Sequence, residues 1–565
     1  MFVVYIRTTT NSAGQSYYHL VESYREGGKV KQRTLLALGR KEDGGLEALA
    51  EAVAKHTGMI TAMGLAKNVA VEDTYILGPL LVAERLFERL GIDAVLARCA
   101  EEHERLEFSL RDIVFELVAS RMVRPTSKLA SFEYMHDKLY PGLAKAQPEL
   151  HQLYRAMDLL AKHKDDVEQS LFAHGRDLFS PKVDVVLYDL TTLRFESTVV
   201  VPDTLRQFGF SKEKRSDCTQ VVLGLLISPD GIPLGFEVFP GNTFEGKTLA
   251  AIADKIRKKF NVRRFIFVAD RGLLSKENLE TIRKIGGEFI LGMRIGGLAK
   301  KRPELFDRKN FRPIGKVGTR EEPTEIFETT FGADRGFVTW SAARAKRDAA
   351  TRTDILDKIA KKLAKTKVST KAFVSNSNYH AYLKGIDAGT PTLDEAKIAE
   401  AAAKDGFFAV VSNVPDLSGE AIYAQYRQLW RIEDSIGEFK GTLKARPIFH
   451  WTDQRIIGHL TLCFIALVCE AHVAKALREQ AEMRKSPAIQ EGVIDPRPLA
   501  AAAVFAELAD VRAVPISMAG QKIWVRTDIK GHVAKLFTAL GLRIPPRLLK
   551  TESVVAQVRP DAATV

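Results

Sequence analysis

The spacing of hydrophobic residues changes along the chain and separates regions of different predicted structure. Between residues 2 and 39, three apolar and aromatic runs are separated by polar or glycine turns, with Gly27-Gly28 between the second and the third. Short β-prone runs around a glycine pair are typical of a hairpin. The pattern therefore predicts a three-stranded meander, with a helix following at about 46–57.

Apolar residues then recur at helical spacing. One periodic run covers 75–100 and breaks at Gly91, and a longer one covers about 108–179. Within the longer run, Arg124–Lys128 forms a short break that contains a proline and lies close to Arg121. This break is interpreted either as a helix–turn–helix-like DNA-binding element or as an ordinary polar turn in a helical bundle.

From residue 183 the pattern changes to short strands and helices. Strands are predicted at 183–190, 219–228, 232–239, 264–270 and 288–294, and helices at 248–260 and 276–285. The order strand-strand-strand-helix-strand-helix-strand is that of a ribonuclease-H-like core, an α/β fold with a mixed sheet. A strand at 407–413 and a helix at 426–440 resume the pattern after a charge-rich interruption at 296–405.

The interruption at 296–405 contains strand-like pieces at 336–340 and 371–375 and a basic stretch at 344–371. Acidic residues dilute the charge of that stretch, so a solvated helix face is the alternative to a nucleic-acid contact. Trp340 lies among strand-like residues. It is interpreted either as a core residue of the interruption or as a platform on which an extruded DNA base stacks.

Three acidic residues carry the candidate chemistry. Asp189 and Asp270 are expected to end apolar strands, and Glu433 lies on the predicted helix. An Asp within an apolar strand is costly to bury unless it is paired or holds a metal. Hard divalent cations prefer oxygen ligands, and paired Mg²⁺ ions held by carboxylates drive phosphoryl transfer. The alternative is that each Asp caps its strand or meets a nearby Arg.

The helix predicted at 426–440 places further groups beside Glu433. Tyr426, Glu433 and Lys440 are spaced seven apart and so share one face, and Trp430 lies on the same side. A carboxylate and a lysine on one helix face usually form a surface pair. The aromatic residues beside them instead favour a half-buried face turned towards the sheet.

Composition limits the kind of partner and compartment. The chain has 565 residues, 46% of them hydrophobic, and a formal net charge of +13, so a polyanionic partner is plausible. Its four cysteines are widely scattered, which favours neither a zinc ribbon nor a disulfide framework. The longest apolar stretch, 460–469, is too short to span a bilayer, and the region from 454 onward is mainly helical, with a strand-like piece at 522–526. We expect a soluble, cytoplasmic protein, associated with the nucleoid and not with a membrane.

The helix resembles the signature of DDE transposases from bacterial insertion sequences, in which Tyr, Arg, Glu and Lys recur as Y-x2-R-x3-E-x6-K. Tyr426, Glu433 and Lys440 fit that spacing, whereas Leu429 stands at the Arg position. Asp189, within Tyr-Asp-Leu-Thr-Thr, matches the first acid of the family. The second acid is matched by Asp270, within Ala-Asp-Arg-Gly.

Local matches extend the resemblance over roughly residues 1–480. The segments 209–217, 121–129 and 446–451 resemble elements of the same family, and the interruption resembles its β-rich insertion. The domains expected are a β-meander and helix at 1–60, a helical DNA-end-binding region at 61–180, a ribonuclease-H-like catalytic core at 181–295 and 406–480, an insertion at 296–405, and a C-terminal region at 481–565 that is a candidate for dimerisation.

The resemblance implies a metal-dependent transposase that cleaves and joins DNA at the ends of its own insertion sequence. It implies that Asp189, Asp270 and Glu433 hold two Mg²⁺ (or Mn²⁺) ions. The implied partner is double-stranded DNA, both the terminal inverted repeats and the target, held by a homodimer. The DNA contacts expected are Lys440, Tyr426, Arg431, Arg427, Lys212, Arg215, Arg271, Trp340, Arg121, Arg124 and Lys128. A catalytically silent DNA-binding protein derived from a transposase and a structure-selective nuclease are the alternatives.

Overall fold

The computed structural model describes residues 3–46, 49–50, 69–71, 73–103, 105–175, 184–213, 215–244, 248, 252, 259–260, 264–273, 275–316, 323–364, 377–385, 391–483, 501–518 and 521–549. The chain divides into two compact units. The first comprises Met1–Thr74, Ala513–Thr527 and Arg547–Lys550, and the second Tyr75–Arg512, Asp528–Pro546 and Thr551–Val565. The domain bounds expected from the sequence stay a prediction.

The described residues of the first unit form two antiparallel sheets. One is the meander of β1 (Val3–Thr10), β2 (Ser16–Glu26) and β3 (Lys29–Arg40). Gly27 and Gly28 turn between β2 and β3 with φ of 58° and 79°, values that glycine adopts without strain. The predicted meander is confirmed, but most of the helix predicted at about 46–57 lies outside the described residues. The second sheet is formed by β19 (Leu548–Leu549), β18 (Gln521–Arg526), β17 (Arg512–Met518) and β4 (Val69–Val71).

The second unit begins with a group of helices. They are α2 (Gly78–Arg89), α3 (Ile92–Glu101), α4 (Leu110–Val123), α5 (Lys128–Lys138), α6 (Leu150–Lys162) and α7 (Lys164–His174). The predicted break at Gly91 is confirmed, because this residue separates α2 from α3 with a left-handed φ of 65°. The predicted break near Pro125 is confirmed as the connection between α4 and α5.

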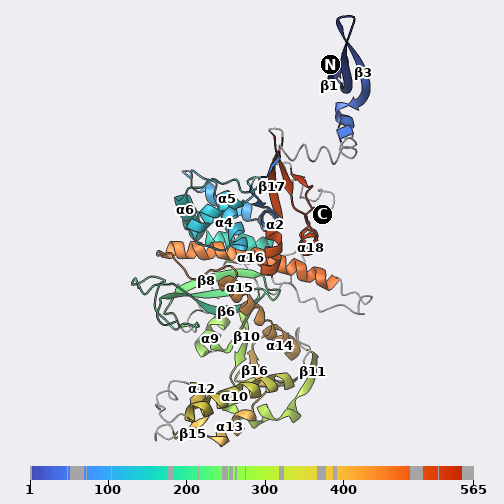
Figure 1. Ribbon diagram of the computed structural model, residues 1–565. Helices are drawn as coiled ribbons and strands as arrows, with labels where there is room; N and C mark the ends of the chain where they lie inside the picture. The colour runs from blue at the N-terminus through green and yellow to red at the C-terminus, as the bar shows by residue number, and fades with distance from the viewer. Residues whose placement is uncertain are drawn as a thin grey trace. The chain divides into compact units, whose positions relative to one another are not determined.

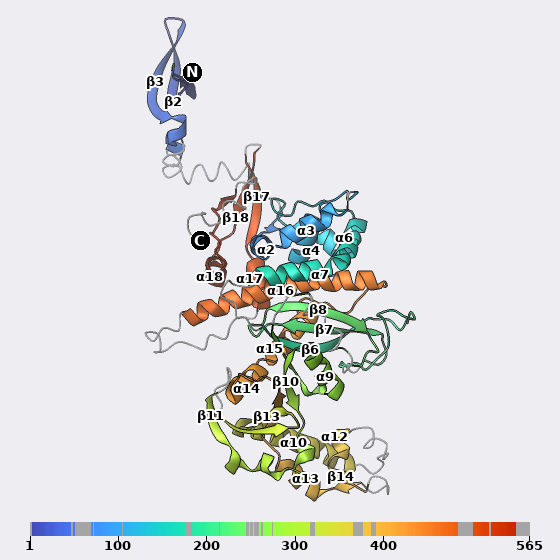
Figure 2. The same cartoon turned by 180° about the vertical axis from the view of Figure 1, so that it is seen from behind.

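A long apolar helix, α16 (Asp453–Met483), joins the helices to a sheet. It packs against α4, α6 and the strand β8 (Pro233–Pro240), and both views show it running between the two layers (Figure 1, Figure 2). Among the described residues it is the helix long and apolar enough to cross a membrane, but 89% of its most apolar window is buried within the protein. Such burial is typical of the core helix of a folded domain.

Nine strands of the described residues form the large mixed sheet of the second unit. Its spatial order is β11-β12-β13-β16-β10-β9-β6-β7-β8. The strands predicted between 183 and 294 are confirmed as β6 (Asp184–Arg194), β7 (Gln220–Ile227), β8, β9 (Phe265–Ala269) and β10 (Glu288–Met293). β9 runs parallel to both β6 and β10, whereas β7 and β8 are antiparallel additions. The helix predicted at 276–285 is confirmed as α9 (Lys276–Lys284), and the one predicted at 248–260 lies largely outside the described residues.

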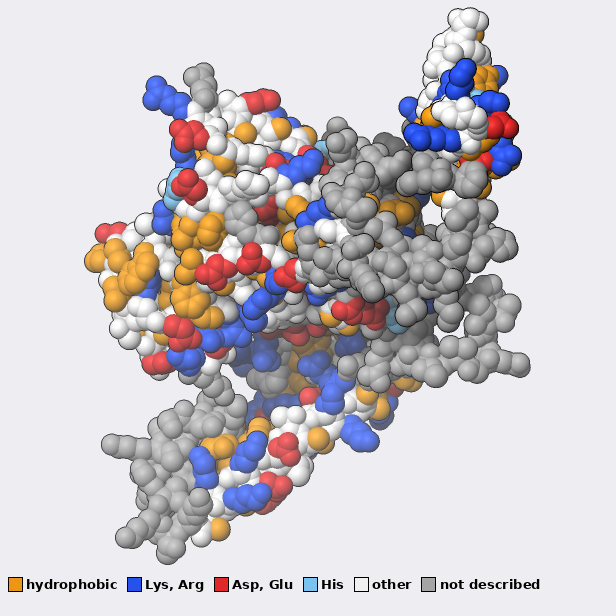
Figure 3. All heavy atoms as spheres, turned by 45° about the horizontal axis from the view of Figure 1, so that its top comes forward, with side chains coloured by type: hydrophobic (Ala, Val, Ile, Leu, Met, Phe, Trp, Pro, Cys, Tyr) orange, Lys and Arg blue, Asp and Glu red, His pale blue; other side chains and the backbone are white. Residues whose placement is uncertain are grey.

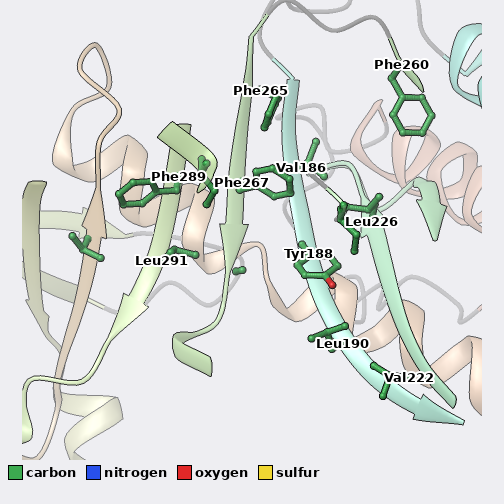
Figure 4. Packing of buried hydrophobic residues seen from close by; sticks show 14 residues of the cluster. Val186, Tyr188, Leu190, Val222, Leu226, Phe260, Phe265, Phe267, Phe289 and Leu291 are labelled. Carbon is green, nitrogen blue, oxygen red and sulfur yellow. The ribbon is translucent and has the colours of Figure 1, made fainter. Parts of the chain in front are cut away.

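Side chains from one face of this sheet form a hydrophobic core. Val186, Tyr188 and Leu190 alternate along β6 and meet Phe267 of β9 and Phe289 of β10 (Figure 4). Because successive side chains of a strand point to opposite faces, the residues between them on β6 face the other way. Asp189 is therefore directed away from this core, on the side where α15 (Trp430–Lys440) packs on β6.

The interruption continues the same sheet and adds helices. β11 (Arg312–Lys316), β12 (Pro323–Phe331) and β13 (Asp334–Trp340) extend it, and β13 pairs with β16 (Phe407–Ser412), which in turn pairs with β10. The strand-like piece predicted at 371–375 lies outside the described residues. The remaining α-helices and strands in the described part of the second unit are β5 (Tyr75–Ile76), α10 (Ala342–Leu363), α12 (Ser377–His380), β14 (Leu383–Lys384), β15 (Thr392–Leu393), α13 (Glu395–Ala402), α14 (Gly419–Arg427), α17 (Ala501–Ala509) and α18 (Gly531–Ala539).

Candidate active site

A cleft of about 850 Å³ in the second unit contains all three acidic residues singled out in the sequence. Its lining comes from β6, from the residue that follows β9, from the start of β16, and from α10, α14 and α15. Asp189, Asp270 and Glu433 are separated by up to 244 positions in the chain, yet they line this one cavity. We refer to it below as the acidic cleft.

Strand register brings two of the carboxylates together. Tyr188 of β6 pairs with Ala269 of the parallel strand β9, so Asp189 and Asp270 are the next residues of neighbouring strands. Such strands lie about 4.8 Å apart. The expectation that Asp189 ends its strand is wrong, because β6 stays paired with β7 as far as Arg194. What ends beside Asp189 is the pairing with β9.

The third carboxylate comes from a helix that is shorter than predicted. The expectation of one helix over 426–440 is wrong, since α14 ends at Arg427 and α15 begins at Trp430. At the junction, Leu429 N donates to Tyr426 O, a tight turn that changes the direction of the chain. Tyr426 and Glu433 therefore reach the acidic cleft from two different helices.

Tyr426 is held against the second aspartate. Its hydroxyl donates to Asp270 Oδ1 at 3.2 Å, and burial, followed by the negative charge of Asp270, raises the pKa of the phenol. The phenol is therefore protonated at neutral pH and acts as a donor. Gly292 of β10 makes room for it, because a Cβ at this position would lie 2.4 Å from the Tyr426 hydroxyl oxygen.

The electrostatics of Glu433 show that the carboxylates influence one another. Burial and then the negative charges of Asp270 and Asp434 raise the pKa of Glu433. Oxygen donors of this kind are the ligands that Mg²⁺ and Mn²⁺ prefer, and a cation between them relieves their repulsion. Within the described residues, no group of three or more His, Cys, Asp or Glu side chains is close enough to form a ready-made metal site. The carboxylates of the acidic cleft fit a divalent cation by their donor chemistry.

Basic side chains surround the acids. Lys212 lies with its Nζ 3.8 Å from Asp189 Oδ1 and donates to Leu190 O at 2.6 Å. Arg344 and Arg347 of α10 and Arg427 of α14 also line the acidic cleft. On the face drawn in Figure 3, by contrast, Lys and Arg side chains are interspersed with Asp and Glu. Basic and acidic side chains thus line the acidic cleft together.

Lys440 occupies a different environment from the one expected. Its Nζ lies 3.0 Å from Glu213 Oε1, and only 12% of its side chain is exposed. Glu213 also accepts hydrogen bonds from Arg194 and Arg446. Burial opposes the charge of this carboxylate, but Lys440 and the two arginines hold its pKa below the usual value. Lys440 thus belongs to an ion network beside the acidic cleft, and its contact with phosphate stays a prediction.

Several other predicted contacts are bound to protein partners. Arg215 forms a two-pronged pair with Asp217, with N–O distances of 2.7 and 2.9 Å. Arg431 donates to Gln428 and lies 5.0 Å from the ring centroid of Trp430. Arg271 is exposed and lines a smaller cavity of about 340 Å³ beside the acidic cleft, together with Arg344.

Two of the three predicted contacts in the α4–α5 break, Arg121 and Lys128, are buried, whereas Arg124 is exposed. Arg121 donates to Leu443 O at 2.7 Å and to Thr126 O at 3.1 Å, and only 4% of it is exposed. Lys128 is equally buried, and Arg124 lies over the ring of Tyr134. The break therefore joins two parts of the fold, and its contact with DNA stays a prediction.

Trp340, predicted as a base-stacking residue or a core residue, is half-buried in the interruption. Its Nε1 donates to Asp405 O at 3.1 Å, and the Arg308 guanidinium carbon lies 3.5 Å from the ring centroid. One ring face is thus already occupied by a cation. A role in base stacking stays a prediction.

Sequence reasoning missed two features of the cleft. Gly292 interrupts an otherwise apolar strand, which signals a close approach by another group. The second feature is the pair Arg344 and Arg347 within the basic stretch, since their spacing of three places them on one helix face. The position of α10 relative to the acids depends on the pairing of β13 with β16. No local sequence pattern reveals that pairing.

Comparisons with known proteins identify the family. Residues 181–469, about half of the chain, match the model of the transposase DDE domain, and residues 6–61 match that of the IS1634 family transposase N-terminal domain. A comparison with curated proteins gives no match. The first match spans the strands, the interruption and the helix that together build the acidic cleft. The chain therefore belongs to the DDE transposases of insertion sequences.

Proposed function

We propose that this transposase carries out metal-dependent DNA strand cleavage and strand transfer at the ends of its insertion sequence, on a ribonuclease-H-like core. The observation that supports the proposal is the convergence of Asp189, Asp270 and Glu433 on one cleft with basic walls. When bound by these carboxylates, two Mg²⁺ or Mn²⁺ ions supply the positive charge that activates the attacking oxygen and stabilises the leaving oxygen.

The protein's own residues position the carboxylates and the substrate. The Tyr426 hydroxyl fixes one carboxylate oxygen of Asp270, and Lys212 balances part of the charge of Asp189. Arg344 and Arg347 bind phosphates of the DNA that enters the cleft, because guanidinium groups match phosphate geometry. This arrangement places a scissile phosphate next to the acids without covalent participation of the protein.

The substrate is double-stranded DNA. It comprises the terminal inverted repeats of the element and a target, with both ends held by a homodimer in the cytoplasm. Recognition of the ends is assigned to residues 1–180, and salt dependence is its first test. Each phosphate contact contributes about one to the slope of log affinity against log salt concentration.

The test replaces each acid by its amide. Asp189→Asn, Asp270→Asn and Glu433→Gln keep side-chain size but remove the charge that holds a cation, so each is expected to lower cleavage and joining by more than about 10³-fold. Binding to end DNA should persist. The assay follows a labelled end duplex with Mg²⁺ and a target plasmid, and chelation of the metal should abolish both products.

Asp434→Asn is the matched control, since Asp434 also lines the cleft and is the chain neighbour of Glu433. We expect less than about a tenfold effect from it, since it lies outside the signature positions. Full activity of Asp189→Asn would refute the assignment. Wild-type protein that binds ends but never cuts would indicate a silent DNA-binding protein, and one that cuts but never joins a 3′-hydroxyl would indicate a nuclease.

A further inference from the structure

A second cleft, of about 410 Å³, lies between the α4–α5 break and the chain that follows α15. One wall contains Thr126, Lys128 and Tyr154, and the other contains the segment 444–452 and the first turns of α16. Its volume is in the range of sites that bind small molecules or single nucleotides. None of the acids of the acidic cleft lines it.

The charge of this second cleft is entirely positive. Its lining, as far as the described residues define it, includes no Asp or Glu, and its basic members are Arg121, Lys128, Lys444, Arg446 and Arg455. Two of these are balanced elsewhere, since Arg446 pairs with Glu213 and Arg455 with Asp158 at 3.4 Å.

Lys128 is the member of this set that points to a ligand. Only 4% of it is exposed, and the described lining of the cleft around it contains no carboxylate to balance its charge. Burial and then the charge of Arg121 lower the pKa of Lys128 to about 7. A buried ammonium without a counterion is unfavourable, and an anion in the cleft would remove that cost.

Aromatic side chains stand at the opening. Phe449 is 66% exposed and Trp451 57% exposed, although rings of this size are usually covered in a folded protein. The Arg206 guanidinium carbon lies 4.3 Å from the centroid of the Trp451 ring, so the ring is already held in place. A positive pocket beside exposed rings is the combination that binds a phosphate together with an unstacked base.

The rigidity of the wall supports a built site. Lys444 adopts a left-handed φ of 46°, which is rare for a residue other than glycine. Arg121 holds this strained turn by donating to Leu443 O and Lys444 O. Arg446 links the wall to Glu213, the chain neighbour of Lys212 in the acidic cleft.

We propose that the second cleft binds one nucleotide of the DNA strand that enters the acidic cleft, with a phosphate next to Lys128 and Lys444 and the base stacked on Phe449 or Trp451. This rests on the proposed function, because it takes DNA as the substrate. It adds a second, single-nucleotide contact outside the acidic cleft. DNA is the favoured source of the phosphate because the second cleft is joined to the acidic cleft by the ion network of Glu213.

The test compares Lys128→Met and Lys309→Met for binding to a duplex of the element end over a range of salt concentrations. Lys309 is exposed and lines neither cleft, so it is the matched control for loss of one charge. Lys128→Met should lower the salt slope by about one, whereas Lys309→Met should leave it unchanged. Removal of an unpaired buried charge should not lower the melting temperature, so a binding defect would not reflect unfolding.

A second variant probes the base. Trp451→Ala should weaken binding by about five- to 150-fold, and Trp451→Phe should restore most of it. With 2-aminopurine placed along the end, one position should change fluorescence with wild type but not with Trp451→Ala. Unchanged slope and unchanged affinity in these variants would overturn the inference while leaving the proposed function intact. Failure of wild type to bind end DNA would overturn both, and equal competition by a free mononucleotide would overturn DNA as the occupant.

Discussion

The contact between Tyr426 and Asp270 permits a quantitative prediction. Tyr426→Phe removes the hydroxyl that donates to Asp270 Oδ1 and keeps the ring, whose centroid lies 5.0 Å from that of Phe408. Hydrogen bonds to charged groups contribute about 1.5–3 kcal/mol. The distance is 3.2 Å and Asp270 is exposed, so the lower value applies. We expect cleavage to slow by about tenfold, with little change in the free energy of unfolding.

Gly292 supplies the second half of the prediction. A methyl group at this position would lie 2.4 Å from the Tyr426 hydroxyl oxygen and 3.1 Å from Cζ of that ring. Gly292→Ala must therefore displace the hydroxyl from Asp270, and we expect it to slow cleavage by about tenfold as well. Tyr426→Phe removes the hydroxyl oxygen that the added methyl group would contact most closely. Both variants are therefore expected to slow cleavage through loss of the same hydrogen bond to Asp270.

A double-mutant cycle tests this reasoning. If both changes act through the same hydrogen bond, the double variant should lose about tenfold and not about a hundredfold. Single-turnover cleavage of a pre-bound end duplex measures the chemical step, and end-binding affinity and melting temperature serve as controls. A hundredfold loss in the double variant would show that the residues act independently, and the argument from the Gly292 contact would be refuted.

Three further predictions address other parts of the second unit. Replacing both Arg344 and Arg347 by Gln should lower the salt slope of DNA binding by about two, whereas Lys346→Gln on the same helix should not change it. Burial raises the pKa of Glu116 from its ordinary value of 4.5 to about 8, so the folded state binds more protons between these values. The free energy of unfolding should therefore fall from about pH 5 to about pH 8 by a component that Glu116→Gln removes, as urea titrations would show. Trp340→Ala should destabilise the fold by about 2 kcal/mol in the same titrations, and normal end products from the folded variant would exclude base stacking.

Much of the core is predictable because its signals are local. The strands β6, β7, β8, β9 and β10 are short apolar runs bounded by polar turns, and all five were found from the sequence. Buried strands leave this signature because each residue must be apolar unless it has a function. The aspartates stood out for the same reason. The sequence therefore indicated both aspartates of the sheet, which the register of β6 and β9 places on neighbouring strands.

The features that the sequence did not predict depend on tertiary contacts. The end of α14 has no glycine or proline, and the turn there is made by i to i+3 hydrogen bonds such as that from Leu429 N to Tyr426 O. Seven-residue spacing cannot reveal such a change of direction. The burial of Arg121 and Lys128 likewise results from chain that lies more than three hundred positions away, at 443–459. The positive charge of Arg121 and Lys128 suggested an exposed surface, whereas the fold buries both residues.

The interruption is better understood as part of the acidic cleft than as an appendage. Trp340 pairs with Phe407 in the shared sheet, and α10 begins two residues later. Arg352 of that helix forms a two-pronged pair with Asp405, with N–O distances of 2.5 and 2.7 Å. These contacts fix the first turns of α10, which carry Arg344.

A fixed position matters for the chemistry. The Arg344 guanidinium carbon lies 4.4 Å from the ring centroid of Phe408, so this cation is held at the edge of the acidic cleft before DNA arrives. Positive charge that is already in place costs no reorganisation when phosphate charge develops, whereas charge on a loose surface loop would. α10 follows β13 in the chain and α14 follows β16, and these two strands pair with each other. The residues at 296–405 therefore contribute basic groups to the same site as the three acids.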